Sequence, residues 1–109
     1  MVGIRKLREA IRQVLHEYAA LPRNGLASHI VWDEKADRYL LLAFGWRGVK
    51  NYHYCVAHLE ITDGKIWIHR DGTEEGLATE LEHKGVSKQQ MVLAFHEPEM
   101  RAYTEYAAA

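Results

Sequence analysis

The side chains with the clearest chemical potential lie in the middle of the chain, where Arg70 and Asp71 are followed by Glu74. Near the end of the chain, His96 and Glu99 add an imidazole and a further carboxylate, which can also take part in proton transfer or metal binding. Carboxylates and imidazoles are the usual general acids, general bases and metal ligands of hydrolases. If the fold brought these five residues into one cleft, the chain could act as a small metal-dependent hydrolase or nuclease.

A structural interpretation of the same segment competes with the chemical one. Asp71 lies three residues before Glu74, which is the spacing of a capping box, so Asp71 or Thr73 would accept backbone N–H bonds at the start of a helix. A rigid turn on a stable scaffold often forms part of the surface that recognises a partner. Arg70 and Glu74 are therefore also candidates for a partner-binding surface.

The histidines and the single cysteine indicate neither a metal site nor a nucleophile. His53 and His58 are five residues apart, so they face opposite sides of a strand, and no histidine pair has ligand spacing. Cys55 is the only cysteine, and we place it on an apolar strand face as a buried structural thiol. We therefore expect no metal and no other cofactor.

Length and charge narrow the function classes. The 109 residues suit one domain spanning 1–109, and 14 Lys plus Arg against 15 Asp plus Glu give a formal net charge of -1. Proteins that hold nucleic acid unaided usually carry a basic excess, so we expect no direct nucleic-acid binding by the chain alone. A basic strip on the first helix is the alternative, made of Lys6, Arg8, Arg12 and Arg23. Glu9 and Glu17 interrupt that strip.

The sequence gives no sign of export or of membrane insertion. Its first residues are charged and form no apolar signal region, and no apolar run approaches the roughly 18 residues that span a bilayer. We expect a cytoplasmic protein without membrane contact.

Hydrophobic periodicity predicts an α+β fold. Apolar residues at three- and four-residue steps predict an N-terminal helix from Ile4 to Tyr18. Alternation and turn signals then predict a four-stranded antiparallel meander, with strands at Ile30–Trp32, Tyr39–Trp46, Tyr52–Ile61 and Lys65–Arg70. The second of these strands is apolar on both faces, which indicates that a helix or a partner covers each side. Strict alternation in the third strand places His53, Cys55, Ala57, Leu59 and Ile61 on its core face.

Helices follow the predicted sheet. One begins near Asp71 and runs towards Gly85, and a last helix spans Pro98 to Tyr106, with proline at its first position. Between them, Met91 to Phe95 fits either a short helical turn after Ser87 or another strand.

The aromatic residues exceed what a thin sheet backed by one or two helices easily buries. They are Trp32, Trp46 and Trp67, with Tyr39, Tyr52 and Tyr54. Ordinary core packing is one explanation, and interfaces also favour aromatic anchors. We predict self-association through the second face of the sheet.

Three segments resemble the XisI family, the fdxN element excision controlling factors. Gly64 to Gly76, with its Ile-Trp-Ile followed by Arg-Asp-Gly-Thr-Glu, looks like the family signature. Asp37 to Trp46 resembles the central strand of the family, and Val92 to Thr104 resembles its C-terminal block. The sequence departs from the family pattern at His69, Ser87 and Glu97.

The resemblance implies a non-catalytic regulatory protein. Such a protein acts with XisH, an endonuclease-like companion, so that a separate recombinase can excise a DNA element, and the implied host is cyanobacterial. It implies no catalytic residues for this chain. As partner-binding candidates we take Trp46, Trp67, Arg70, Asp71, Glu74, His96, Glu99 and Arg101.

Overall fold

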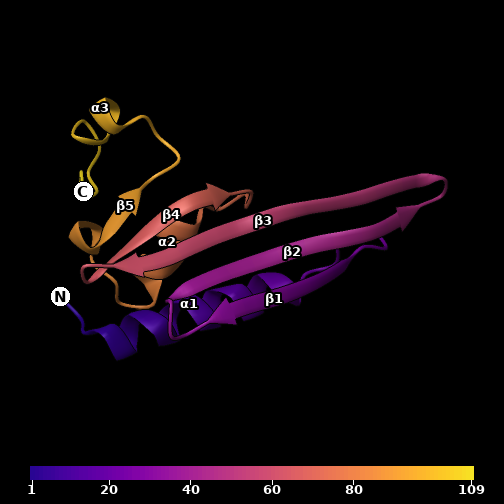
Figure 1. The fold of residues 1–109 in the computed structure, drawn as a ribbon, viewed down its shortest axis with the longest axis horizontal. Coiled ribbons are helices and arrows are strands. Elements are labelled where there is room, and N and C mark those ends of the chain that lie inside the picture. Colours follow the sequence, from indigo (N-terminus) through magenta and orange to yellow (C-terminus); the bar gives the residue numbers. More distant parts are fainter.

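The computed structural model describes residues 1–109 as a five-stranded sheet with helices on one of its faces (Figure 1). In chain order the elements are α1 (Ile4–Ala19), β1 (Ala27–Asp33), β2 (Arg38–Arg47), β3 (Lys50–Thr62), β4 (Lys65–Asp71), α2 (Leu77–His83), the 3-10 turn η1 (Lys88–Gln90), β5 (Met91–Leu93) and α3 (Pro98–Arg101). The strands follow one another in space in their order along the chain. The first four are antiparallel, which confirms the predicted meander.

The count of four strands is wrong, because β5 adds a fifth. It pairs in parallel with β4, so that Ile66 lies opposite Met91 and Ile68 opposite Leu93. Parallel neighbours need a crossover connection, which α2 and η1 supply here. An apolar run of three residues cannot be distinguished from a helical turn by its periodicity, and the alternative left open at Met91 is resolved as a strand.

The two C-terminal helices are shorter than predicted. Helix α2 begins at Leu77 and not near Asp71, because Asp71 is still the last residue of β4. Helix α3 ends at Arg101 and not at Tyr106. The chain turns back after Arg101 because Ala107 pairs with Val92 of β5 and donates its backbone N–H to the Met91 carbonyl at 2.9 Å.

The core lies between the helices and one face of the sheet. Both α1 and α2 lie behind the sheet in Figure 1, and the apolar residues on their inner sides are buried there. The cluster joins Leu7, Ile11, Val14 and Leu15 of α1 and Leu77 and Leu81 of α2 with Tyr39, Leu41, Leu59, Ile66 and Ile68 of the sheet. No helix is long and apolar enough to cross a membrane.

The other face of the sheet has no helix over β1 to β3. In β2, Tyr39, Leu41 and Ala43 are fully buried, whereas the alternating residues Leu40, Leu42 and Phe44 remain half-buried. Helices therefore cover this apolar strand on one side only. We call the uncovered side the open face.

A β-bulge in β3 corrects the predicted orientation of the cysteine. Leu41 pairs with Ala57 but Leu42 pairs with Cys55, so Val56 is an extra residue in β3. Because side chains alternate along a strand, one extra residue reverses the faces of everything before it. Cys55 consequently lies half-buried on the open face beside Leu42, and His53 shares that face.

The β2–β3 hairpin extends beyond the rest of the sheet (Figure 1). Strand β1 reaches only as far as the Ala27–Phe44 pair, and β4 reaches only as far as the Ala57–Asp71 pair. Beyond the Gly45–Tyr52 pair no further strand pairs with either of them, although the Arg47 side chain contacts the loop before β1. We call residues 45–52 the β-arm; it ends in a tight turn at Gly48 and Val49.

Candidate partner-binding groove

The loop between β4 and α2 is held together by one carboxylate. Asp71 accepts the backbone N–H of Thr73 at 3.0 Å through Oδ1 and the backbone N–H of Leu77 at 2.8 Å through Oδ2. The predicted role of Asp71 as an acceptor for backbone N–H groups is confirmed, although it reaches a helix that starts six residues later. Because both oxygens are engaged in this way, Asp71 is a structural residue of the loop.

Two further contacts fix the same loop. The Thr73 hydroxyl donates to Asp71 and accepts the Gly76 backbone N–H at 3.2 Å. At the other end, the Gly72 N–H donates to the Val56 carbonyl at 2.7 Å. Gly76 also has a φ of 92°, a conformation that favours glycine. The loop therefore holds the side chains between Gly72 and Gly76 in fixed positions.

A groove of about 500 Å³ separates this loop from the end of α1. Its walls are Tyr18, Leu21, Pro22 and Arg23 on one side and residues 72–75 on the other. A smaller hollow of about 290 Å³ continues it and adds Glu80 and Glu17, of which Glu17 is paired with Lys84 at 2.8 Å. We call the two hollows together the signature groove.

The signature groove combines an apolar floor with an acidic rim. Leu21 is 53% exposed, and Glu74 and Glu75 are exposed above it. The Tyr18 hydroxyl is buried without a hydrogen-bond partner, and this burial raises the pKa of Tyr18. Such a surface can hold an apolar side chain next to a lysine or arginine of another chain. Tyr18 and Leu21 were not predicted as site residues, because they lie where the helical pattern ends. No residue type near them indicates a contact with residues 72–75.

The eight predicted partner-binding residues fall into four separate places. Asp71 and Glu74 belong to the loop between β4 and α2, which we call the signature loop, and Glu74 lines the groove. Arg70 is exposed and turns back along the sheet, where its Nε donates to the Cys55 carbonyl at 3.4 Å. Trp46 is 65% exposed on the β-arm.

The remaining four residues form a C-terminal cluster. The Arg101 guanidinium lies 5.6 Å from the centre of the Trp67 ring and donates to the carbonyls of His96 and Ala94. His96 and Glu99 are exposed on this segment, which Figure 1 places at the opposite end of the molecule from the β-arm. The cleft of the hydrolase alternative does not form, because Glu74 lines the signature groove whereas neither His96 nor Glu99 lines any hollow of the structure.

A histidine pair lies on the open face beside β4. His69 Nε2 is 2.9 Å from Glu60 Oε1, and the rings of His58 and His69 are 4.9 Å apart. Burial, followed by the proximity of His69, lowers the pKa of His58. No group of three or more histidine, cysteine, aspartate or glutamate side chains is arranged to hold a metal ion.

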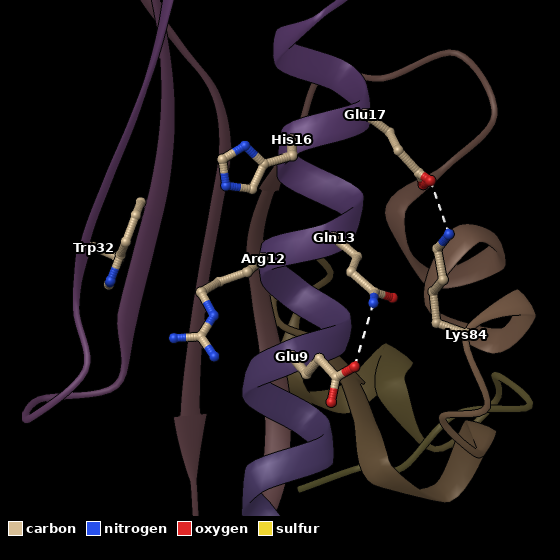
Figure 2. Close-up of a pocket in the computed structure, with 7 residues that line it drawn as sticks. All are labelled: Glu9, Arg12, Gln13, His16, Glu17, Trp32 and Lys84. Carbon is tan, nitrogen blue, oxygen red and sulfur yellow. Dashed lines mark hydrogen bonds and ion pairs between the residues drawn. The ribbon is translucent and has the colours of Figure 1, made fainter.

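A third hollow, of about 650 Å³, lies between α1 and β1 (Figure 2). Three of its four charged residues already have partners of opposite charge: Lys84 Nζ is 2.8 Å from Glu17, and Arg12 is 3.5 Å from Glu34 of the neighbouring turn. The ring of His16 meets that of Trp32 edge-on at 6.4 Å. Since most of its charges already have partners, this hollow is a weaker candidate than the signature groove.

The chain is similar to known proteins along nearly its whole length. The sequence model of a family described as XisI protein matches residues 1–108. The crystal structure of a XisI-like protein from Anabaena variabilis ATCC 29413 is 31% identical, covers 95% of this chain and 97% of its own, and superposes with a TM-score of 0.87. The crystal structure of the fdxN element excision controlling factor XisI from the same organism is 33% identical, covers 95% and 99%, and gives a TM-score of 0.78. No curated protein matches the chain.

Proposed function

Since the chain belongs to the XisI family, we propose that it is a non-catalytic regulatory protein that controls the programmed excision of a DNA element. The observation that carries this proposal is its similarity along nearly its full length to the fdxN element excision controlling factor. In this proposal the chain works in the cytoplasm with an endonuclease-like protein of the XisH type, while a separate recombinase performs the chemistry.

The signature groove supports a binding role. Its loop is fixed by Asp71 and Thr73, and a fixed loop loses little conformational entropy when a partner docks. Its exposed apolar floor and acidic rim match a partner segment that carries an apolar residue next to a lysine or an arginine. A catalytic role finds less support, because the Asp71 carboxylate is engaged by backbone N–H groups.

Co-expression with the XisH-type companion tests the proposal. We expect a complex that survives purification, that Leu21→Asp together with Glu75→Lys disrupts, and that Lys35→Gln at the β1–β2 turn leaves intact. Failure of the companion to co-purify at several salt concentrations would contradict the proposal. So would metal-dependent DNA cleavage by this chain alone.

We also propose that the chain self-associates through the open face. That face bears half-buried Leu40, Leu42 and Phe44, with Val31 at 48% exposure. Two copies facing each other would cover this apolar surface. Light scattering at high micromolar concentration should give a mass above that of a monomer, and Leu42→Glu should restore the monomer. A monomeric wild-type chain would contradict the proposal.

A further inference from the structure

The β-arm lies in the longest stretch of the chain without a negative charge. Residues 38–59 contain no aspartate and no glutamate, although the chain has 15 of them. The charged residues of the arm itself are Arg47 and Lys50, next to its tip. The net charge of -1 is therefore a sum over separate regions, and the arm is locally positive.

The two cations on the β-arm are not neutralised. Arg47 donates to the backbone carbonyls of Arg23 at 2.8 Å and Asn24 at 3.0 Å, and neither it nor Lys50 is in an ion pair with a carboxylate. Both lie over the Tyr52 ring, at 4.7 Å and 5.0 Å from its centre. Their charge therefore stays available, on one face of the arm, to an anionic partner.

Half of the basic strip suggested by the sequence is, in contrast, already paired. Arg8 is 2.7 Å from Asp37, and Arg12 is 3.5 Å from Glu34. Of that strip, Lys6 and Arg23 remain outside any ion pair, and the Arg23 carbonyl accepts a hydrogen bond from Arg47 at the base of the β-arm. The two middle arginines of the strip are therefore not available to an anionic partner, whereas the cations of the β-arm are.

The shape of the β-arm suits a groove of duplex DNA. It is a two-stranded ribbon with no strand on either edge, and it projects along the longest dimension of the molecule, which is 45 Å (Figure 1). A ribbon of two strands fits the major groove, where exposed apolar side chains can contact the methyl group of thymine. Trp46 at 65% exposure and Val49 at 98% are such side chains. A lone hairpin is only marginally stable in water, so these residues gain most from a partner.

We propose that the β-arm binds duplex DNA. Arg47 and Lys50 contact phosphates with help from Arg23, while Trp46 and Val49 lie against the groove. The contribution of Arg23 is the weakest, because it shares the signature groove with Glu74 and Glu75. The proposal goes beyond control of excision through a companion and does not rest on it, because the chain itself would touch DNA. It also goes against the expectation drawn from net charge.

The expected affinity is low and depends strongly on salt. About three phosphate contacts give a slope of roughly -2.7 for the logarithm of the binding constant against the logarithm of salt concentration. Affinity should then rise roughly 40-fold when salt falls from about 200 mM to about 50 mM. Removing one contact should reduce the magnitude of the slope by roughly 0.9.

Fluorescence anisotropy of a labelled duplex of arbitrary sequence, titrated with the full chain, tests the proposal. We expect binding at about 50 mM salt, with Lys50→Glu weakening it at least about tenfold and Lys50→Gln reducing the salt slope by roughly one contact. Val49→Asp should weaken binding as well. The matched control is Lys35→Gln, which removes one exposed lysine at the β1–β2 turn and should change neither value. Circular dichroism verifies that each variant is folded.

Several outcomes would overturn the proposal. The first is that the wild-type chain does not bind at about 50 mM salt, where phosphate contacts are strongest. The second is that Lys50→Gln leaves the salt slope unchanged. The third is that Lys35→Gln weakens binding as much as the change at Lys50 does. Tighter binding to the matching single strand would overturn the assignment to duplex DNA. If Lys50→Glu blocked capture of the companion while the wild-type chain bound no DNA, the arm would be a protein-binding surface instead. Because companion capture and DNA binding are read separately, failure of one proposal is distinguishable from failure of the other.

Discussion

Asp37 Oδ1 accepts a 2.7 Å hydrogen bond from Arg8 Nε, and this contact joins helix α1 to the turn between β1 and β2. The same oxygen accepts a 3.3 Å bond from the Tyr39 hydroxyl, and the burial of that hydroxyl raises the pKa of Tyr39 to about 12. Asp37 also has a φ of 52°, a region in which asparagine and aspartate are the best-tolerated residues after glycine. Asp37→Asn therefore removes the charge without straining the backbone.

The Arg8–Asp37 pair should make stability depend on pH. The hydrogen bond from Arg8 lowers the pKa of Asp37 below its ordinary value of 3.8, so folding favours the ionised form. The stabilisation is fully present above that ordinary value and is lost as the pH falls through the lower value of the folded state. Thermal unfolding should show Asp37→Asn less stable than the wild type at neutral pH. The difference should shrink in acid, and a constant difference at every pH would contradict this origin.

Gly72→Ala should destabilise the signature loop. A Cβ atom at this position would lie 3.0 Å from the Val56 carbonyl oxygen, a backbone atom that already accepts the Gly72 N–H. We expect a loss of about 1–3 kcal/mol in the free energy of unfolding, as for other overpacked sites. Denaturant titration measures it, with Glu74→Ala in the same loop as the control. Equal stability of the two variants would show that the loop yields more easily than we infer.

Asp71→Ala should destabilise the protein and should not remove a reaction. The change leaves the backbone N–H groups of Thr73 and Leu77 without their acceptor, at a cost of about 1–3 kcal/mol. Asp71→Asn keeps one acceptor oxygen and should lose less. Hydrogen exchange at Leu77 should quicken in both variants. A variant that is as stable as the wild type but lacks an activity of the wild-type chain would favour the hydrolase interpretation.

Gln90→Ala should loosen the N-terminus. Gln90 is the one buried polar residue of the core; its Nε2 donates to the Val2 carbonyl at 2.7 Å, and its Oε1 accepts the Val2 N–H at 3.0 Å. Losing both bonds should cost about 1–3 kcal/mol, seen as a lower unfolding midpoint. Gln89→Ala, at the exposed neighbouring position, removes one bond to the Glu105 carbonyl and is the matched control. An equal midpoint for both variants would mean that the two Val2 contacts add no more stability than that single exposed bond.

The sequence predicted the parts of the fold in which pattern and packing agree. The periodicity from Ile4 to Tyr18 identified a helix that buries Leu7, Ile11 and Leu15 as expected. The Asp63-Gly64 turn correctly joined two strands, because its φ values of 52° and 75° are those that aspartate and glycine tolerate. Local rules of this kind depend on a few neighbouring residues.

What could not be predicted depends on contacts that are distant along the chain. The bulge at Val56 reverses the side of Cys55, and no residue type near it indicates one extra residue. The signature groove forms because Tyr18 and Leu21 meet residues 72–75, and that meeting follows from the packing of α1 against α2. The ion pairs of Arg8 and Arg12, which neutralise two of the four cations of the basic strip, arise from the placement of the β1–β2 turn in the same way.

Both termini lie at the end of the molecule opposite the β-arm (Figure 1). Val2 is bound to Gln90, and Ala107 pairs with Val92, so the two ends of the chain converge on the edge of the sheet at β5. A protein tethered to a surface or a fluorophore through its last residues would therefore present the hairpin tip freely to the solution. Immobilisation through Cys55 would instead block the open face and the base of the hairpin, which makes the site of attachment itself a way to separate the two surfaces.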